Sequence, residues 1–206
     1  MRLRRYWRFL VALLGWFALT LQFSLLVFNP APPPAPVSIL NFFSYFTILT
    51  NILVAVAMTV GAFAADSAFF NRAGVRAAIA VYIAIVGAVY FLILRHTWDP
   101  QGWQLVADRL LHYATPALYL VDWIAFAPKR GLKPSKIANW LIYPTAYGAY
   151  AIARGATTGF YAYPFLDASV LGYGRVLINM AILIAVFAVV SFALIAASKL
   201  PPQRAR

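Results

Sequence analysis

The chain has 206 residues, 64% hydrophobic and 11% charged, which leaves too little polar surface to cover a soluble globule. It has no cysteine, which excludes disulfides, thiolate nucleophiles and cysteine-ligated metals. With no glutamate and two histidines, no other metal site or cofactor is expected. A formal net charge of +12 would suggest a nucleic-acid partner for a soluble protein, but here we expect it to report membrane topology.

Six segments carry the roughly 20 mostly apolar residues that a membrane-spanning helix needs. In chain order they are residues 7–28, 38–64, 75–95, 105–127, 137–158 and 172–198. The connectors between them have loop composition, beginning with the proline-rich 29–36, which cannot continue a helix. We therefore predict an all-α fold with a single domain, residues 1–206, built as a six-helix transmembrane bundle.

The basic residues test this topology, because cytoplasmic loops of membrane proteins are enriched in lysine and arginine. Thirteen of the 17 fall on one side: Arg2, Arg4, Arg5, Arg8, Arg72, Arg76, Lys129, Arg130, Lys133, Lys136, Lys199, Arg204 and Arg206. We predict that this side, with both termini, is cytoplasmic. A cleaved signal peptide over 1–28 is the alternative, but its apolar run is long and its removal would discard the strongest inside signal.

Polar residues recur at helical spacing in three of the predicted spans. They are Asn41, Ser44, Thr47 and Asn51; then Asp108, His112, Thr115, Tyr119 and Asp122; then Tyr143, Tyr147, Tyr150 and Arg154. Polar side chains in a membrane usually face the interior of the bundle or a cavity. The three faces therefore predict one shared polar interior.

Depth along the helices sharpens this prediction. At 1.5 Å per residue, Thr47 lies roughly 13 Å and His112 roughly 10 Å below the outer ends of their helices, with Tyr150 near the same level. Asp108 and Arg154 would lie just above them. We expect a buried polar layer that opens toward the outer face.

A hydroxyl and an imidazole at matched depth are the minimum for nucleophilic acyl transfer, and Thr47 and His112 are such a pair. A membrane threonine more commonly bonds a carbonyl of its own helix or a neighbouring helix. Asp108, one turn before His112, reaches the ring only from a relaxed rotamer, and no other third triad member is evident. His96 is expected in a solvated loop, and Asp122 paired with a lysine of the fourth loop or a tyrosine hydroxyl.

Three segments together resemble a known family. They are residues 42–51 (FFSYFTILTN), 111–116 (LHYATP) and 159–167 (GFYAYPFLD). In order and spacing they resemble the androgen-induced and androgen-dependent TFPI-regulating membrane proteins and their bacterial relatives. The run Tyr-Pro-Phe-Leu-Asp is the most specific part, whereas Pro116 follows His112 at a slightly shorter separation than in the family pattern.

The resemblance implies a six-helix membrane threonine hydrolase that cleaves lipid esters, such as fatty acid esters of hydroxy fatty acids. By position it implies Thr47 as the nucleophile and His112 as the general base, the pair that depth also matched. Thr50 is the fallback nucleophile, although it lies on another face of its helix. A multi-pass protein of the bacterial cytoplasmic membrane, acting on a lipid without a cofactor, is the expected setting.

The same chemistry needs an oxyanion stabiliser and a handle for the substrate. Asn51, one turn from Thr47, is the expected donor, with Ser44, Asp108 and Tyr150 around it. Arg154 or Arg109 could bind a lipid carboxylate. The alternative is a lipid or small-molecule binder or transporter without catalysis. Haem bound by His96 and His112 is poorly supported, and the lack of a lysine inside a span excludes a retinal receptor.

Overall fold

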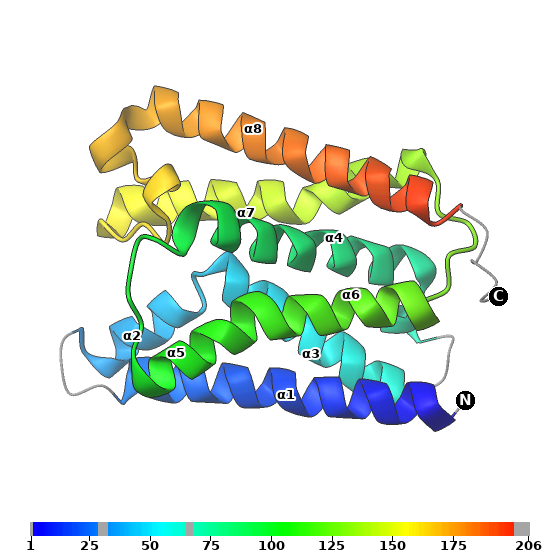
Figure 1. Cartoon of the computed structure of the whole chain (residues 1–206). Helices are drawn as coiled ribbons and strands as arrows, with labels where there is room; N and C mark the ends of the chain where they lie inside the picture. Colours follow the sequence, from blue (N-terminus) through cyan, green and yellow to red (C-terminus); the bar gives the residue numbers. More distant parts are fainter. Residues whose placement is uncertain (1, 29–32, 65–67, 200–206) are drawn as a thin grey trace.

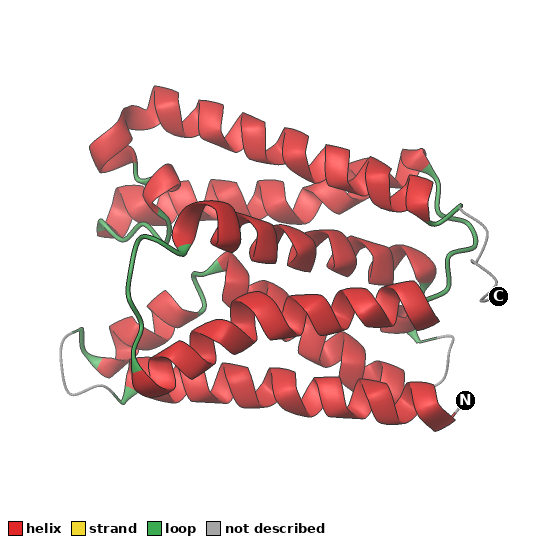
Figure 2. Cartoon of the chain, viewed as in Figure 1, coloured by secondary structure: helices red, strands yellow, loops and turns green. Residues whose placement is uncertain are grey.

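The computed structural model describes residues 2–28, 33–64 and 68–199, and this part of the chain is helical, with no strand (Figure 2). Its helices are α1 (Arg2–Val27), α2 (Ala35–Phe42), α3 (Phe46–Phe63), η1 (Phe69–Asn71), α4 (Ala73–Val89), η2 (Tyr90–Leu94), α5 (Gly102–Arg109), η3 (Leu110–Ala114), α6 (Thr115–Phe126), η4 (Pro134–Lys136), α7 (Ile137–Thr158), η5 (Pro164–Leu166) and α8 (Ala168–Ala197). Residues 29–32 of the proline-rich connector, Arg204 and Arg206 lie outside the described residues.

Four helices are long and apolar enough to cross a membrane. They are Arg2–Val27, Phe46–Phe63, Ala73–Leu94 and Ala168–Ala197. The other two predicted spans are also helical, as α5–η3–α6 and as α7, and their crossing stays a prediction. The helices pack side by side, and α1 begins at the end of the bundle where α8 ends (Figure 1). The all-α prediction is confirmed, and the apolar helices fit a multi-pass membrane protein.

The segment 38–64 is not one helix, as the sequence predicted, but two. The chain breaks between α2 and α3, where the amides of Ser44 and Tyr45 donate to the carbonyls of Asn41 and Phe42 in a tight turn. The hydroxyl of Ser44 also bonds the carbonyl of Leu40 at 2.6 Å. Serine competes in this way with the helical hydrogen bonds, so a serine in an apolar run can mark an interruption.

The polar side chains of α7 were predicted to face a shared polar interior. Three of them instead form hydrogen bonds with residues at the break between α2 and α3. Tyr147 donates to the Ser44 carbonyl at 2.9 Å, and the Tyr150 hydroxyl lies 2.9 Å from Ser44 Oγ. One turn further, Arg154 donates to Asn41 Oδ1 at 2.7 Å. Irregular backbone inside a membrane needs partners for its polar groups, and tyrosine hydroxyls and a guanidinium supply them here.

Two of the helical stretches contain a π turn. One is η2, which continues α4, and the other is η3, which joins α5 to α6. A π turn holds an extra residue, so it shifts the direction of the side chains that follow, and such turns are frequent at functional sites. The two π turns carry Tyr90 and His112, whose rings stack.

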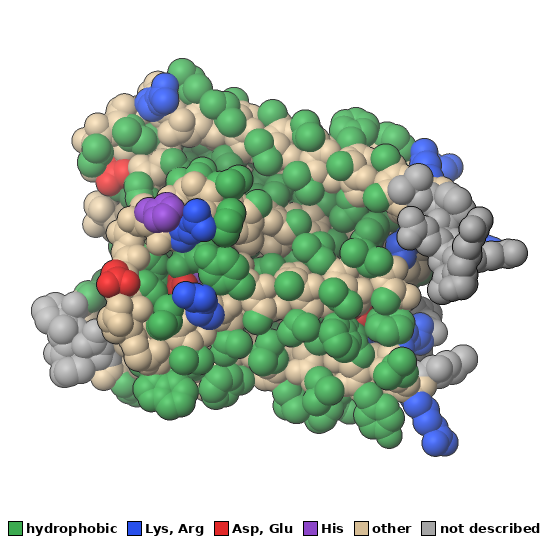
Figure 3. All heavy atoms as spheres, viewed as in Figure 1, with side chains coloured by type: hydrophobic (Ala, Val, Ile, Leu, Met, Phe, Trp, Pro, Cys, Tyr) green, Lys and Arg blue, Asp and Glu red, His purple; other side chains and the backbone are tan. Residues whose placement is uncertain are grey.

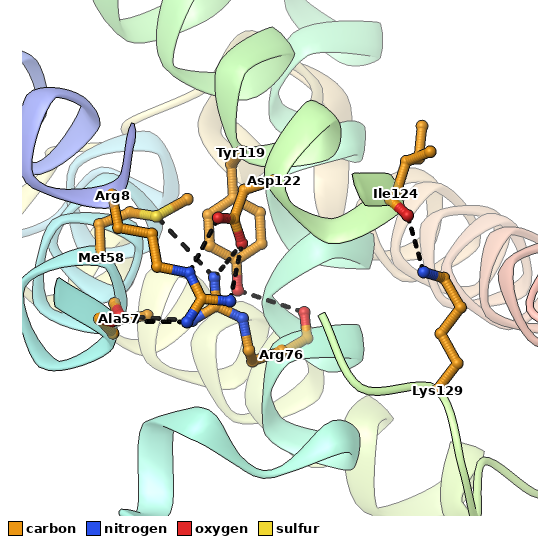
Figure 4. A network of polar contacts seen from close by, with 9 residues as sticks. Arg8, Ala57, Met58, Arg76, Tyr119, Asp122, Ile124 and Lys129 are labelled. Atoms are coloured by element: carbon orange, nitrogen blue, oxygen red, sulfur yellow. Dashed lines mark hydrogen bonds and ion pairs between the residues drawn. The ribbon is translucent and has the colours of Figure 1, made fainter. Parts of the chain in front are cut away.

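An ion cluster is buried near the end where α1 begins. Asp122 of α6 accepts hydrogen bonds from Arg8 of α1, at 2.9 Å, and from Arg76 of α4 (Figure 4). The three residues are at most 1% exposed. The predicted partners of Asp122 were wrong: Lys129 of the fourth loop donates to the Ile124 carbonyl, and the hydrogen bonds to the carboxylate from the described residues come from Arg8 and Arg76.

The ion cluster carries two positive charges and one negative. The carbonyls of Gly61 and Ala57, near the C-terminus of α3, accept from Arg8 and Arg76 at 3.4 Å each. The C-terminal end of a helix carries a partial negative charge, so the ends of α3 and α6 offset the excess positive charge. Two arginines that the sequence assigned to topology thus also join α1, α3, α4 and α6 from inside.

Candidate active site

A cavity of about 360 Å³ lies at the opposite end of the bundle from the ion cluster. Its walls come from the end of α1, the break between α2 and α3, the π turns η2 and η3, α5, and the connector between α7 and α8. Thr47 and His112, the predicted nucleophile and base, both line it, together with Tyr90, Asp108 and Tyr163. We call it the Thr47 cavity.

His112 is held on three sides. Its Nδ1 lies 3.1 Å from Asp108 Oδ1 and 3.0 Å from the Asp108 carbonyl, and the Tyr90 ring stacks on the imidazole with centroids 3.9 Å apart. Tyr90 Oη in turn donates to Asp108 Oδ2. Both acceptors near Nδ1 call for a proton on that nitrogen, which in a neutral imidazole leaves the lone pair on Nε2. This is the tautomer that a general base requires.

The π turn explains why Asp108 reaches the ring. Asp108 lies in the last turn of α5, directly before η3, and His112 lies within η3. The sequence analysis assumed an α-helical turn and placed this contact only in a relaxed rotamer. The wider π turn changes the relative direction of the two side chains. Asp108 is 2% exposed, and it contacts the ring in two ways: its main-chain carbonyl is the hydrogen-bond partner of Nδ1, and its carboxylate lies close by without a hydrogen bond to the ring.

Thr47 lies in the first turn of α3, next to the break, and is 8% exposed. Its amide donates to the Tyr163 hydroxyl at 3.1 Å, and its Oγ1 lies 3.3 Å from the same oxygen. Burial raises the pKa of Tyr163, in the connector between α7 and α8, to about 12, despite the opposing effect of the Thr47 hydrogen bonds. Its phenol therefore stays protonated and can donate a hydrogen bond at neutral pH.

The break in the helix also frees backbone amides beside Thr47. The first amides of a helix have no acceptor within it, and in the described part of the chain the amide of Ile48 bonds no carbonyl of the preceding turn. Ile48 lines the Thr47 cavity as well. The amide that follows a nucleophile at a helix start is a known oxyanion donor in hydrolases. Asn51 was the predicted oxyanion donor. Its Nδ2 instead donates to the carbonyls of Thr47, at 2.8 Å, and Leu111, at 3.2 Å, so both of its hydrogens already have acceptors.

No hydrogen bond joins Thr47 to His112 among the described residues; the hydroxyl of Thr47 bonds Tyr163 instead. The two predicted catalytic side chains face a common space, in which a substrate would lie between them. A second cavity, of about 60 Å³ and mostly apolar, adjoins the first. Thr47, Leu94 and Tyr163 line both.

Several other predicted site residues lie away from the Thr47 cavity. Ser44 and Tyr150 bond each other at the helix break, and Thr50, the fallback nucleophile, lies 3.2 Å from the Tyr143 hydroxyl and is fully buried. None of them lines the cavity. Of the two threonines, the structure brings only Thr47 to the space that His112 faces.

The predicted carboxylate-binding arginines are also directed elsewhere. Arg154 bonds Asn41 and lies over the Phe160 ring, and Arg109 lies 5.8 Å from the centroid of the Tyr113 ring. Neither lines the Thr47 cavity. His96 is exposed, as predicted, and does not line it either.

Sequence reasoning missed Tyr90 and Tyr163 as site residues. Tyr163 belongs to the most specific segment of the family resemblance, a signal that could have found it. Tyr90 begins η2, whose other residues are apolar, and a tyrosine hydroxyl in such a segment needs a hydrogen-bond partner. Only the packing of α4 against η3 shows that this partner is Asp108.

Comparison with known proteins adds no identification, since the chain matches no protein-family model, no curated protein and no solved structure.

Proposed function

We propose that this chain is an intramembrane hydrolase of lipid esters, with Thr47 as nucleophile, His112 as general base and Asp108 as the residue that orients the base. In this proposal the chain spans a bacterial inner membrane six times, both termini are cytoplasmic, and the Thr47 cavity opens toward the outer face. The distribution of the basic residues supports this orientation.

The observation that carries the proposal is the environment of His112. A carboxylate and a stacked phenol hold its ring with Nδ1 engaged, at a cavity that a buried threonine shares. A structural histidine needs no such cavity. Ionisable groups inside a membrane are costly, so a buried aspartate beside a half-buried histidine that lines open space indicates a function. The three segments that resemble the threonine hydrolase family contain Thr47, His112 and Tyr163.

In the proposed reaction, Thr47 Oγ1 turns from Tyr163 and attacks the carbonyl carbon of the ester, and its proton passes to Nε2 of His112. The ester C–O bond breaks, and the alcohol leaves with that proton. Water then gives a proton to His112 and attacks the acyl–threonine. This releases the fatty acid and restores the hydroxyl.

The negative charge on the carbonyl oxygen needs a donor that is already in place. The amide of Ile48, at the positive end of α3, and the protonated hydroxyl of Tyr163 are the two groups that suit it. Both lie beside Thr47 because the helix starts there. The break between α2 and α3 is therefore part of the proposed machinery.

A fluorophosphonate probe tests the proposal on the full-length protein in lipid nanodiscs. We expect a covalent adduct on Thr47, found by peptide mass spectrometry, and its loss in Thr47→Ala and His112→Ala. Thr50→Ala and His96→Ala are the matched controls, since these residues do not line the Thr47 cavity, and both should still be labelled. Labelling that persists in Thr47→Ala would contradict the proposal.

The second candidate is a lipid-binding or lipid-transporting protein, which the hydrogen bond from Thr47 to Tyr163, in place of His112, favours. In that case the probe would not react with wild-type protein, and an intact lipid ester would be recovered unchanged after incubation. Release of fatty acid by the wild type and not by Thr47→Ala would exclude it.

A further inference from the structure

The Thr47 cavity has no cationic side chain in its described walls. Apart from tyrosines, the ionisable side chains that line it are Asp108 and His112. No lysine or arginine is among the lining residues. Asp108 is 2% exposed, so its charge faces the cavity with little screening by water. The electrostatic character of the interior is therefore set by one carboxylate beside one imidazole.

Three arginines at this end of the bundle have partners outside the cavity, and the exposed Arg175, near the start of α8, does not line the cavity either. Arg95 donates to His96 at 2.9 Å and lies 4.0 Å from the Phe91 centroid. Arg154 is bonded to Asn41, and Arg109 is directed at a tyrosine ring. Binding a lipid carboxylate inside the cavity would require an arginine to move into it from outside its described walls.

The polar part of the cavity wall next to Asp108, one turn earlier on α5, is made of neutral groups. Gln104 of α5 donates to Gln22 of α1 at 2.8 Å, and Thr97 and Trp98 lie in the loop beside them. The contact uses the oxygen of Gln22 and one hydrogen of Gln104. The remaining amide groups can donate to and accept from hydroxyl or carbonyl groups.

We infer that the substrate is an uncharged lipid ester, without a free carboxylate on either chain; this inference rests on the proposed hydrolase function. A carboxylate placed in the cavity would be repelled by Asp108 in a medium of low dielectric constant and would meet amides instead of a guanidinium. Hydrolysis of the neutral ester makes a fatty acid, and once this acid ionises the same repulsion drives it out of the cavity.

Two esters that differ only in charge test the inference. One is a hydroxy fatty acid acylated on its hydroxyl, and the other is the same molecule with a primary carboxamide in place of the carboxylic acid. With full-length protein in zwitterionic nanodiscs, we expect kcat/KM for the amide to be at least tenfold higher. Equal rates, or faster cleavage of the acid, would overturn the inference and leave the hydrolase standing. Cleavage of neither ester would refute both.

A charge added at the amide wall gives an independent check. Gln104→Lys should lower the ratio of kcat/KM for the neutral ester to that for the acid at least fivefold, because it adds a cation to the cavity wall. Gln101→Lys is the matched control, because Gln101 is exposed, lies three residues away and does not line the cavity. An unchanged ratio in Gln104→Lys, or an equal change in the control, would count against the inference.

Discussion

The bundle contains two clusters of ionisable side chains, one near each end, and they differ in the space around them. The ion cluster of Arg8, Arg76 and Asp122 is enclosed on all sides, with its carboxylate divided between two guanidinium groups. The Asp108–His112 pair lines a cavity of about 360 Å³. An enclosed charge can only join helices, whereas a charge beside open space can act on a ligand.

The surface shows a related difference. Apolar side chains cover much of the face drawn in Figure 3, as expected of a surface that meets lipid, and charged side chains gather toward the two ends. The clusters lie beneath those ends. Changes to the ion cluster should therefore lower stability, and changes at the Thr47 cavity should lower catalysis. Four substitutions, two at each end, test this separation.

The largest effect is expected for Asp108→Asn. The substitution removes the negative charge that lies 3.1 Å from His112 Nδ1, and an amide nitrogen in place of Oδ1 would donate toward the ring instead of attracting its proton. The ring then keeps only the Asp108 main-chain carbonyl as its partner. We expect kcat for ester hydrolysis to fall about 10³–10⁴-fold, as for loss of the carboxylate from a histidine triad. KM should change little, and circular dichroism should remain helical. Asp99→Asn, on an exposed loop residue, is the control.

Asp122→Asn should lower stability instead. It leaves two buried guanidinium groups without a countercharge, and removal of one partner from a buried ion pair costs roughly 3–5 kcal/mol. Thermal unfolding followed by tryptophan fluorescence should show a large fall in the midpoint. Asp99→Asn again serves as the matched control. A midpoint equal to that of wild type would mean that the ion cluster does not hold the bundle together.

Tyr163→Phe tests the residue that contacts the nucleophile. It removes the hydroxyl that bonds the amide and Oγ1 of Thr47 and keeps the ring. We expect kcat and the rate of fluorophosphonate labelling to fall about 10-fold to 100-fold. Tyr161→Phe, on the same connector and outside the Thr47 cavity, should leave both rates unchanged. Equal losses in the two variants would assign Tyr163 to packing alone.

Gly61→Ala should have the smallest effect. A Cβ at Gly61 would lie 2.8 Å from Arg8 Cδ and 3.2 Å from Arg76 Nη1, so the ion cluster must shift to admit it. Overpacking costs about 1–3 kcal/mol, and the better helix propensity of alanine returns up to about 1 kcal/mol. We expect a net loss near 1 kcal/mol, measured by thermal unfolding. Gly74→Ala meets no atom within 4 Å and should not destabilise.

Much of the fold followed from hydropathy, because an apolar run long enough to cross a membrane has few structures available to it. The segment 137–158 was predicted with the bounds that α7 has. The segment 38–64 was not, since hydropathy does not register the hydrogen bonds of Ser44 that end α2. That omission mattered most, because the break puts Thr47 at the start of a helix.

The candidate site followed in part from the sequence. Thr47 and His112 were paired by depth and by the family resemblance, and the structure brings both to one cavity. The two arginines predicted to bind a substrate carboxylate do not line the cavity: Arg154 contacts Asn41 and Phe160, and Arg109 contacts the Tyr113 ring. Spacing along a helix indicates a face, and it does not say which neighbour that face meets.

By itself, the sequence determined an all-helical, strongly apolar chain with its basic residues concentrated in alternate connectors. These properties depend on composition and local order along the chain. Tertiary structure alone decided which polar residues serve which cluster. The face shared by Asp108, His112, Tyr119 and Asp122 runs from the Thr47 cavity to the ion cluster. The first half of this face packs against Tyr90 and lines the cavity. The second half packs against Arg8 and Arg76 and forms the enclosed ion cluster. The role of an ionisable side chain inside the bundle thus depends on the groups and the space around it.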